Sequence, residues 1–296
     1  MAQAGRLGRM RLPWQNVLCV CVCAVRVHLL SACKSGCESD PLGDGFVKRV
    51  GSELVDEGDK KFRFASINAP NLHRVEVEPK PAECSLRKCS VEEWVRAPSE
   101  YEIRDTLCSI RQMGASVTRI YTFSYGDGPG FHVNRDGVLN EAWFRVFDQM
   151  LAIARDVGVR LIVPLINTNW IEGWGSVYEY GDWANEAGYS FFRSQSQRAM
   201  FKATIELILN RNNSLTGRRY ADDSSILAWE LGNELTDDEF HGFPVPVEWT
   251  RDVARHIRKF DRNHLLMDGG FFSTQVLAVT EIDIVGSGWR IMPNRI

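Results

Sequence analysis

Two kinds of apolar pattern alternate along the chain after residue 40. Continuous apolar runs, typical of buried parallel strands, occur at residues 62–68, 117–123, 159–166, 226–233, 264–267 and 282–285. Between several of them, apolar residues recur at every third or fourth position and predict amphipathic helices at 100–113, 141–157, 195–209 and 247–260. This alternation indicates a parallel sheet with helical crossovers, either a (β/α) barrel or a doubly wound sheet.

The first predicted helix has clear end signals. Ser99 is expected to cap its start and Gly114 to end it. The periodicity assigns to its buried face the residues Tyr101, Ile103, Leu107, Ile110 and Met113. No Gly-rich phosphate-binding loop follows the first strand, which argues against the nucleotide-binding form of a doubly wound sheet.

Composition narrows the class of protein. The chain has 296 residues, of which 44% are hydrophobic, enough for one large core such as a single barrel. A net charge of −3 gives no electrostatic reason to expect nucleic acid or an anionic membrane as a partner. Nine Trp is high for this length, and flat amphipathic rings suit partly polar partners such as sugars.

The N-terminus has the layout of a secretory signal. Arg6, Arg9 and Arg11 precede a largely apolar stretch at 17–32, and small residues follow. We therefore expect residues 1–36 to be a targeting segment and the protein to be secreted. The run Leu30–Cys33 also matches a bacterial lipoprotein box, so lipidation is an alternative.

Cysteine spacing agrees with export. Cys84 and Cys89 lie five residues apart in a Pro-rich stretch, and in an oxidising compartment they could form a disulfide. A metal pair is disfavoured because no His or further Cys lies nearby, so no metal site is expected. Asn212-Asn213-Ser214 is a glycosylation acceptor if the cell is eukaryotic.

The most informative run is Ser225–Glu234, which reads SILAWELGNE. An apolar strand here delivers Asn233 and Glu234 to its C-terminal end, where catalytic side chains lie in a (β/α) barrel. Alternation along the strand places Glu230, Gly232 and Glu234 on the same side. Taken alone, an Asn-Glu pair is more commonly a solvated turn.

The wider stretch 209–234 resembles the endo-β-1,4-mannanases of glycoside hydrolase family 5, a family of (β/α)8 TIM barrels. The resemblance extends over residues 45–285 and is strongest from Thr118 to Glu234. It implies that Glu234 is the general acid/base and that Asn233 holds a sugar 2-hydroxyl in a retaining reaction on β-mannan, without metal or organic cofactor. We also expect a monomer, and the net charge gives no reason to expect a nucleic-acid or membrane partner.

Other positions match the family less closely. By resemblance, Arg119 at the end of the second strand bonds the nucleophile and keeps it ionised, although a surface Arg is the alternative. Asn68 matches a polar position lining the site. The loop 167–184 resembles a mannanase segment and offers sugar-facing rings, which could instead be core, at Trp170, Trp174, Tyr178 and Trp183.

The expected second carboxylate has no counterpart. In the family a Glu at the end of the seventh strand is the nucleophile, whereas this chain supplies about six strands of the eight that a closed barrel needs. Glu281, the last Glu, precedes the sixth strand and is expected at the opposite end of the barrel. The chain departs from the family at two places. The family commonly has Pro or Arg soon after the Asn-Glu pair, whereas here Leu235–Asp238 follow, and Gly286–Gly288 stand where a site His is expected.

These observations predict a barrel that is C-terminally incomplete over residues 40–296. The 296-residue chain by itself is then expected to be inactive and poorly soluble, because one carboxylate is missing and a sheet edge is open. Two alternatives stay open. One is a related β-glycanase acting on another polysaccharide, and the other is a glycan-binding remnant without catalysis.

Overall fold

The computed structural model describes residues 39–77, 91–171, 173–237, 244–270 and 273–286. The predicted signal segment 1–36 and the Cys84–Cys89 pair lie outside these ranges. No helix in the described part of the chain is long and apolar enough to cross a membrane.

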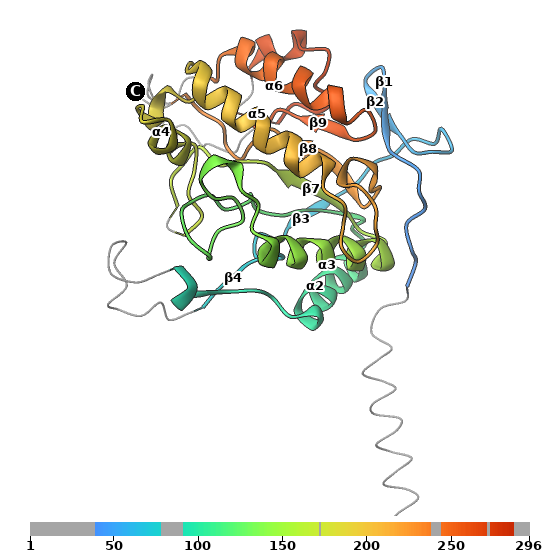
Figure 1. Ribbon diagram of the computed structural model, residues 1–296. Coiled ribbons are helices and arrows are strands. Elements are labelled where there is room, and N and C mark those ends of the chain that lie inside the picture. The colour runs from blue at the N-terminus through green and yellow to red at the C-terminus, as the bar shows by residue number, and fades with distance from the viewer. Residues whose placement is uncertain (1–38, 78–90, 172, 238–243, 271–272, 287–296) are drawn as a thin grey trace, which may run out of the picture. The chain divides into compact units, whose positions relative to one another are not determined.

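The central element is a parallel sheet of five strands, whose order in space follows their order in the chain (Figure 1). The strands are β3 (Ser66–Asn68), β6 (Val117–Arg119), β7 (Arg160–Pro164), β8 (Ile226–Glu230) and β9 (Leu265–Met267). Every neighbouring pair in this sheet is parallel. The observed strands are shorter than the predicted ones, but all five lie within them. The predicted sixth strand is reduced to one parallel bridge between Met267 and Ile284.

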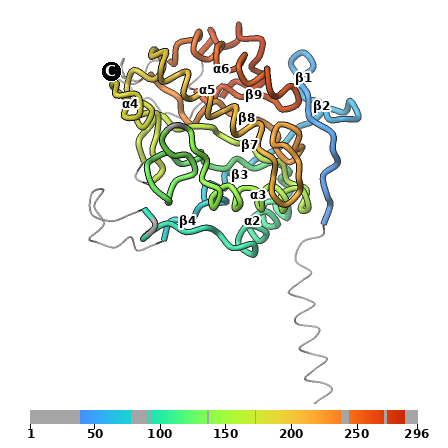
Figure 2. Tube along the Cα trace, in the orientation of Figure 1, coloured from blue at the N-terminus to red at the C-terminus, as the bar shows by residue number. Residues whose placement is uncertain are grey.

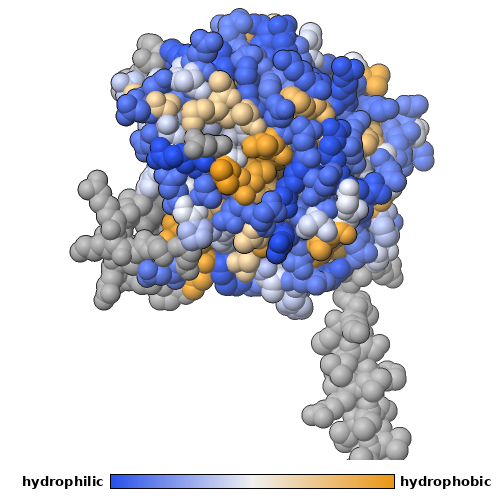
Figure 3. All heavy atoms as spheres, viewed as in Figure 1, coloured by the Kyte–Doolittle hydropathy of each residue, from blue (hydrophilic) through white to orange (hydrophobic). Residues whose placement is uncertain are grey.

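Five helices of the described chain connect these strands; the apolar periodicity predicted four of them, whereas residues 178–184, expected to be part of a loop, form the fifth. They are α2 (Glu100–Gln112), α3 (Glu141–Val157), α4 (Tyr178–Ala184), α5 (Gln195–Asn210) and α6 (Val247–Phe260). In Figure 2 the chain colour changes steadily from α2 and α3 to α6, so successive strand–helix units lie beside one another. The face shown in Figure 3 is mostly hydrophilic, as expected for the outer sides of such helices.

Helix α2 begins as predicted but differs from the prediction in which residues it buries. Its capping box is present, because Ser99 accepts from the Glu102 backbone while the Glu102 carboxylate accepts from the Ser99 backbone. Ile103, Leu107 and Ile110 are buried as predicted. Tyr101 and Met113, however, are 74% and 61% exposed, so both assignments to the buried face are wrong. They lie at the two ends of the helix, beyond the part that packs on the core.

Two antiparallel strand pairs outside the main sheet had no clear sequence signal. The hairpin β1 (Lys48–Val50) and β2 (Glu53–Val55) precedes the sheet, and β4 (Val75–Glu76) pairs with β5 (Val95–Arg96). Leu54 of the hairpin packs against the core cluster that contains Val117, Ile162 and Ala228. The hairpin region therefore helps to cover the apolar residues inside the sheet.

One face of the sheet changes from apolar to charged along the strands. Val117 and Ala228 are buried in the apolar cluster, and two residues further along the same strands stand Arg119 and Glu230. Because side chains two apart on a strand point the same way, the same face is apolar at its start and charged at its C-terminal end. The fold thus collects polar groups at the end where the sequence analysis placed the site.

Candidate active site

A buried ion pair lies at the C-terminal end of the sheet. Arg119 at the end of β6 donates from Nε to Oε2 of Glu230 at 2.6 Å and from its terminal nitrogen to Oε1 at 2.7 Å. The Glu230 side chain is 2% exposed and that of Arg119 18%. This two-pronged geometry fixes the guanidinium as well as neutralising it.

The pair organises two asparagines beside it. The same Arg119 nitrogen donates to the amide oxygen of Asn233 at 2.8 Å, and the Asn233 amide nitrogen donates to the side-chain oxygen of Asn167 at 2.9 Å. The chain Glu230–Arg119–Asn233–Asn167 therefore links the ends of β6, β7 and β8. It fixes the orientation of the Asn233 amide, because each end of the amide has a defined partner.

Burial and ion pairing shift the pKa values of these two side chains in opposite directions. Burial raises the pKa of Glu230, and the Arg119 guanidinium offsets part of that rise. Burial alone would lower the pKa of Arg119, but the bonded Glu230 carboxylate raises it overall. The family resemblance implied that Arg119 bonds a nucleophile, whereas here its carboxylate partner is Glu230. Strand alternation, which puts Glu230 on the side of Glu234, was the signal that could have identified it.

Glu234 stands apart from this buried pair and is exposed. Its backbone has φ of 48°, a left-handed conformation that non-glycine residues adopt at some cost. The turn before it is tight, since a Cβ on Gly232 would stand 2.7 Å from the carbonyl oxygen of Ile166. The Asn169 amide nitrogen approaches Oε2 of Glu234 at 3.5 Å. Glu234 is therefore an exposed residue with a left-handed backbone, and its carboxylate is approached by the Asn169 amide.

Glu234 opens onto a cavity of about 380 Å³. Four of the predicted site residues line it together, namely Asn68, Arg119, Asn233 and Glu234. Tyr121, Asn167, Asn169 and Ile171 also contribute to the lining. Glu234 is the one carboxylate among the lining residues of this cavity in the described chain.

Tyr121 is a site residue that the sequence analysis did not select. Burial raises the pKa of its phenol, and the nearby Glu234 charge raises it further. The group therefore stays protonated and can donate a hydrogen bond near the carboxylate. Its ring meets Trp174 edge-on with centroids 4.8 Å apart. Its position two residues after Arg119 on the same stretch of chain was the available signal.

The predicted aromatic cluster divides into different environments. Trp170 is 44% exposed, while Tyr178 and Trp183 are half-buried. Trp174 is 3% exposed and donates from its indole nitrogen to Glu76 at 2.7 Å, so the structure contradicts its assignment as a sugar-facing ring. None of the four lines the cavity beside Glu234.

Asp268, just after β9, is a second buried acid that the sequence analysis missed. Burial raises its pKa to about 6, although backbone N–H groups including that of Gly286 pull the value down. The Glu230 charge raises it further. Glu281, by contrast, pairs with Arg255 of α6 at 3.0 Å and does not line the cavity beside Glu234.

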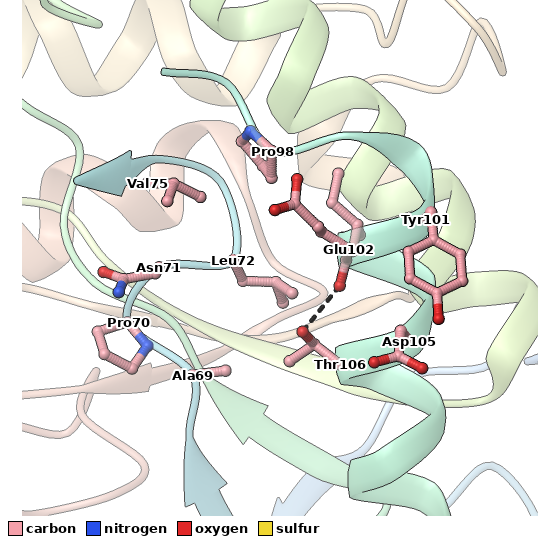
Figure 4. Close-up of a pocket in the computed structure, with 11 residues that line it drawn as sticks. Ala69, Pro70, Asn71, Leu72, Val75, Pro98, Tyr101, Glu102, Asp105 and Thr106 are labelled. Atoms are coloured by element: carbon pink, nitrogen blue, oxygen red, sulfur yellow. Dashed lines mark hydrogen bonds between the residues drawn. The ribbon is translucent and has the colours of Figure 1, made fainter. Parts of the chain in front are cut away.

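A second cavity of about 310 Å³ lies between the loop after β3 and α2 (Figure 4). Pro70 lines both this cavity and that of Glu234. In the described residues, no group of His, Cys, Asp and Glu side chains is arranged to hold a metal ion.

The chain is similar to known glycoside hydrolases. Residues 139–278 match the family model described as GH family 5 beta-mannosidase-like. Mannan endo-1,4-beta-mannosidase 5 of Solanum lycopersicum is 30% identical over 247 residues, which cover 81% of this chain and 54% of that protein. Mannan endo-1,4-beta-mannosidase 2 of Oryza sativa is 33% identical over 77% of this chain and 48% of that protein. The chain is a relative of the family 5 mannanases. The predicted resemblance is therefore confirmed.

The fold prediction is confirmed as well. The endo-1,4-beta-mannanase of Rhizomucor miehei aligns with a TM-score of 0.64 at 22% identity, covering 81% of this chain and 70% of that one. The five-stranded parallel sheet is the corresponding part of the TIM barrel found in these family 5 hydrolases. The chain spans about half the length of the curated relatives it matches.

Proposed function

We propose that the chain carries the acid/base half of a retaining glycoside hydrolase site for β-1,4-mannan. The observation that carries the proposal is the position of Asn233-Glu234 at the end of β8, beside the buried Arg119–Glu230 pair and open to the 380 Å³ cavity. The relatives are mannan endo-1,4-beta-mannosidases, which supports mannan as the substrate class.

In the proposed reaction, Glu234 protonates the departing glycosidic oxygen and later removes a proton from water. Asn233 is already oriented by Arg119 and Asn167, so its free amide N–H can meet a sugar 2-hydroxyl without rearrangement. Tyr121 stays protonated, so it adds no negative charge beside Glu234. Trp170 provides an exposed ring for a sugar near the cavity.

A glycan-binding protein without catalysis is the second candidate. It is favoured by one observation, that Glu234 is the single carboxylate lining the described cavity, whereas a retaining hydrolase needs a pair roughly 5–5.5 Å apart. In both cases we propose that the protein is secreted, on the basis of its basic and then apolar N-terminus, and that it is a monomer.

The test places Glu234→Gln in a form of the barrel that also carries the second carboxylate, and compares it with the same form bearing Glu234. Hydrolysis of β-mannan and of an activated aryl β-mannoside is measured with and without azide. Loss of turnover by about 10²–10⁴-fold in the variant, with azide rescue on the activated substrate, supports the acid/base role. Unchanged turnover in the variant would remove Glu234 from the mechanism. Mannan binding without hydrolysis by the unmodified protein would favour the second candidate.

A further inference from the structure

The segment that carries Trp170 is a closed loop anchored in the site. The Val177 backbone nitrogen donates to the carbonyl oxygen of Asn167 at 2.9 Å, which joins the two ends of the loop. Inside it, the backbone nitrogen of Gly175 donates to the carbonyl oxygen of Ile171 at 3.1 Å. Asn167 also holds Asn233, so the loop begins at the same network that orients the site.

Trp170 lies at the rim of the cavity beside Glu234. Its sequence neighbours Asn169 and Ile171 line the cavity, while Trp170 itself does not. Its side chain is 44% exposed, so ring surface is open to solvent next to the cavity. An indole in this position can stack on a pyranose unit just outside the catalytic pocket, provided that the ring is held still.

Glu179 in the first turn of α4 reaches back to this ring. Its Oε1 accepts from the indole nitrogen of Trp170 at 3.2 Å. Its Oε2 accepts from the backbone nitrogen of Ser176 at 2.5 Å and lies 3.4 Å from the Ser176 hydroxyl. The carboxylate therefore joins the exposed ring to the closed end of the loop.

We propose that Glu179 is a positioning residue that holds the Trp170 indole as a sugar platform at the rim of the Glu234 cavity. The inference deepens the proposed function and rests on it for the identity of the sugar. Its structural part, the control of one indole by one half-buried carboxylate, is independent of catalysis.

The donors around Glu179 explain why a carboxylate suits this position. Two N–H groups, from Trp170 and Ser176, point at its two oxygens. A glutamine has one oxygen and one NH₂ group, so one of these N–H groups would face another donor. Glu179→Gln therefore keeps the size of the side chain while it breaks the link to the ring or to the loop.

The surroundings of Glu179 place its pKa in a range that a titration of the folded protein can reach. Burial raises the pKa of Glu179 to about 7, and Asp182 in the same helix also raises it. No ion pair to Glu179 occurs within the part of the chain that the structure describes. On the other side of the loop, the Arg74 guanidinium donates to the Gly173 carbonyl oxygen.

The first experiment is a fluorescence titration of the full chain from pH 5 to 9. The difference between the unmodified protein and Trp170→Phe isolates the emission of Trp170. We expect a transition with a midpoint near pH 7 in the unmodified protein that disappears in Glu179→Gln. Glu186→Gln is the matched control, because Glu186 bonds Ser194, Ser196 and Gln197 instead of an indole. Persistence of the transition in Glu179→Gln would overturn the proposal.

The second experiment measures affinity for β-1,4-mannobiose and β-1,4-mannohexaose at pH 8. Glu179→Gln and Trp170→Phe should each weaken hexaose binding about 5–10-fold, leave biose binding unchanged, and add little to each other in the double variant. Additive losses, or equal losses for both sugars, would contradict a shared platform. If the unmodified protein binds neither sugar, the proposed mannan site fails, while the titration still decides whether Glu179 controls Trp170.

Discussion

Replacing Arg119 with Met should destabilise the fold by removing the partner of a buried charge. Glu230 is 2% exposed and receives two hydrogen bonds from Arg119, and it has no second cation in the described network. Breaking one side of such a pair typically costs about 3–5 kcal/mol, since the remaining charge must either stay desolvated or take up a proton. Loss of the Asn233 contact adds about 1 kcal/mol.

The loss of stability caused by Arg119→Met should depend on pH, and the direction can be worked out. Without Arg119, burial raises the folded-state pKa of Glu230 further above its unfolded value of about 4.3. The folded variant then binds more protons than its unfolded chain, so its stability falls as pH rises through and above that value. The loss of stability caused by Arg119→Met should be small near pH 4 and largest at pH 7–8.

Urea unfolding followed by circular dichroism at both pH values measures this difference. The double variant Arg119→Met with Glu230→Leu is the control, because replacing both charges with apolar groups should recover most of the loss. It should not recover the hydrogen bond to Asn233. A single variant that loses less than about 1 kcal/mol at pH 8, or loses equally at pH 4 and 8, would refute the argument from an unpaired buried carboxylate.

Two further predictions concern other parts of the fold. Ser99→Ala removes the capping box that Ser99 forms with Glu102 and should cost about 0.5–2 kcal/mol in urea unfolding, whereas Ser109→Ala in the same helix should cost little. The buried pair His73 and His132 should make the protein acid-sensitive, because burial lowers the pKa of His73 to about 4. The stability that their neutral forms contribute is present above about pH 6.5 and is lost as pH falls towards 4. His73→Phe should therefore make stability depend less on pH over that interval, and an unchanged acid profile would exclude His73 as a cause.

The sequence by itself determined the order of strands and helices and the ends of several helices. Apolar periodicity depends only on which residues must leave water, so α6 was predicted at the bounds that the structure gives, and Ser99 marked the start of α2. The Asn233-Glu234 position followed from one apolar strand and one polar turn. Strand lengths were overestimated because an apolar run continues beyond the residues that form ladder hydrogen bonds.

Only the tertiary structure decided which side chains meet. Arg119 and Glu230 are 111 residues apart, and nothing local in either segment specifies that one guanidinium binds the other's carboxylate. Trp170 and Trp174 look equivalent in the loop, yet one is exposed and the other is buried against Tyr121, because burial depends on chain segments that arrive from elsewhere. Pairing and burial of this kind are properties of packing between distant segments, and so the partners of the site residues became visible only in the folded chain.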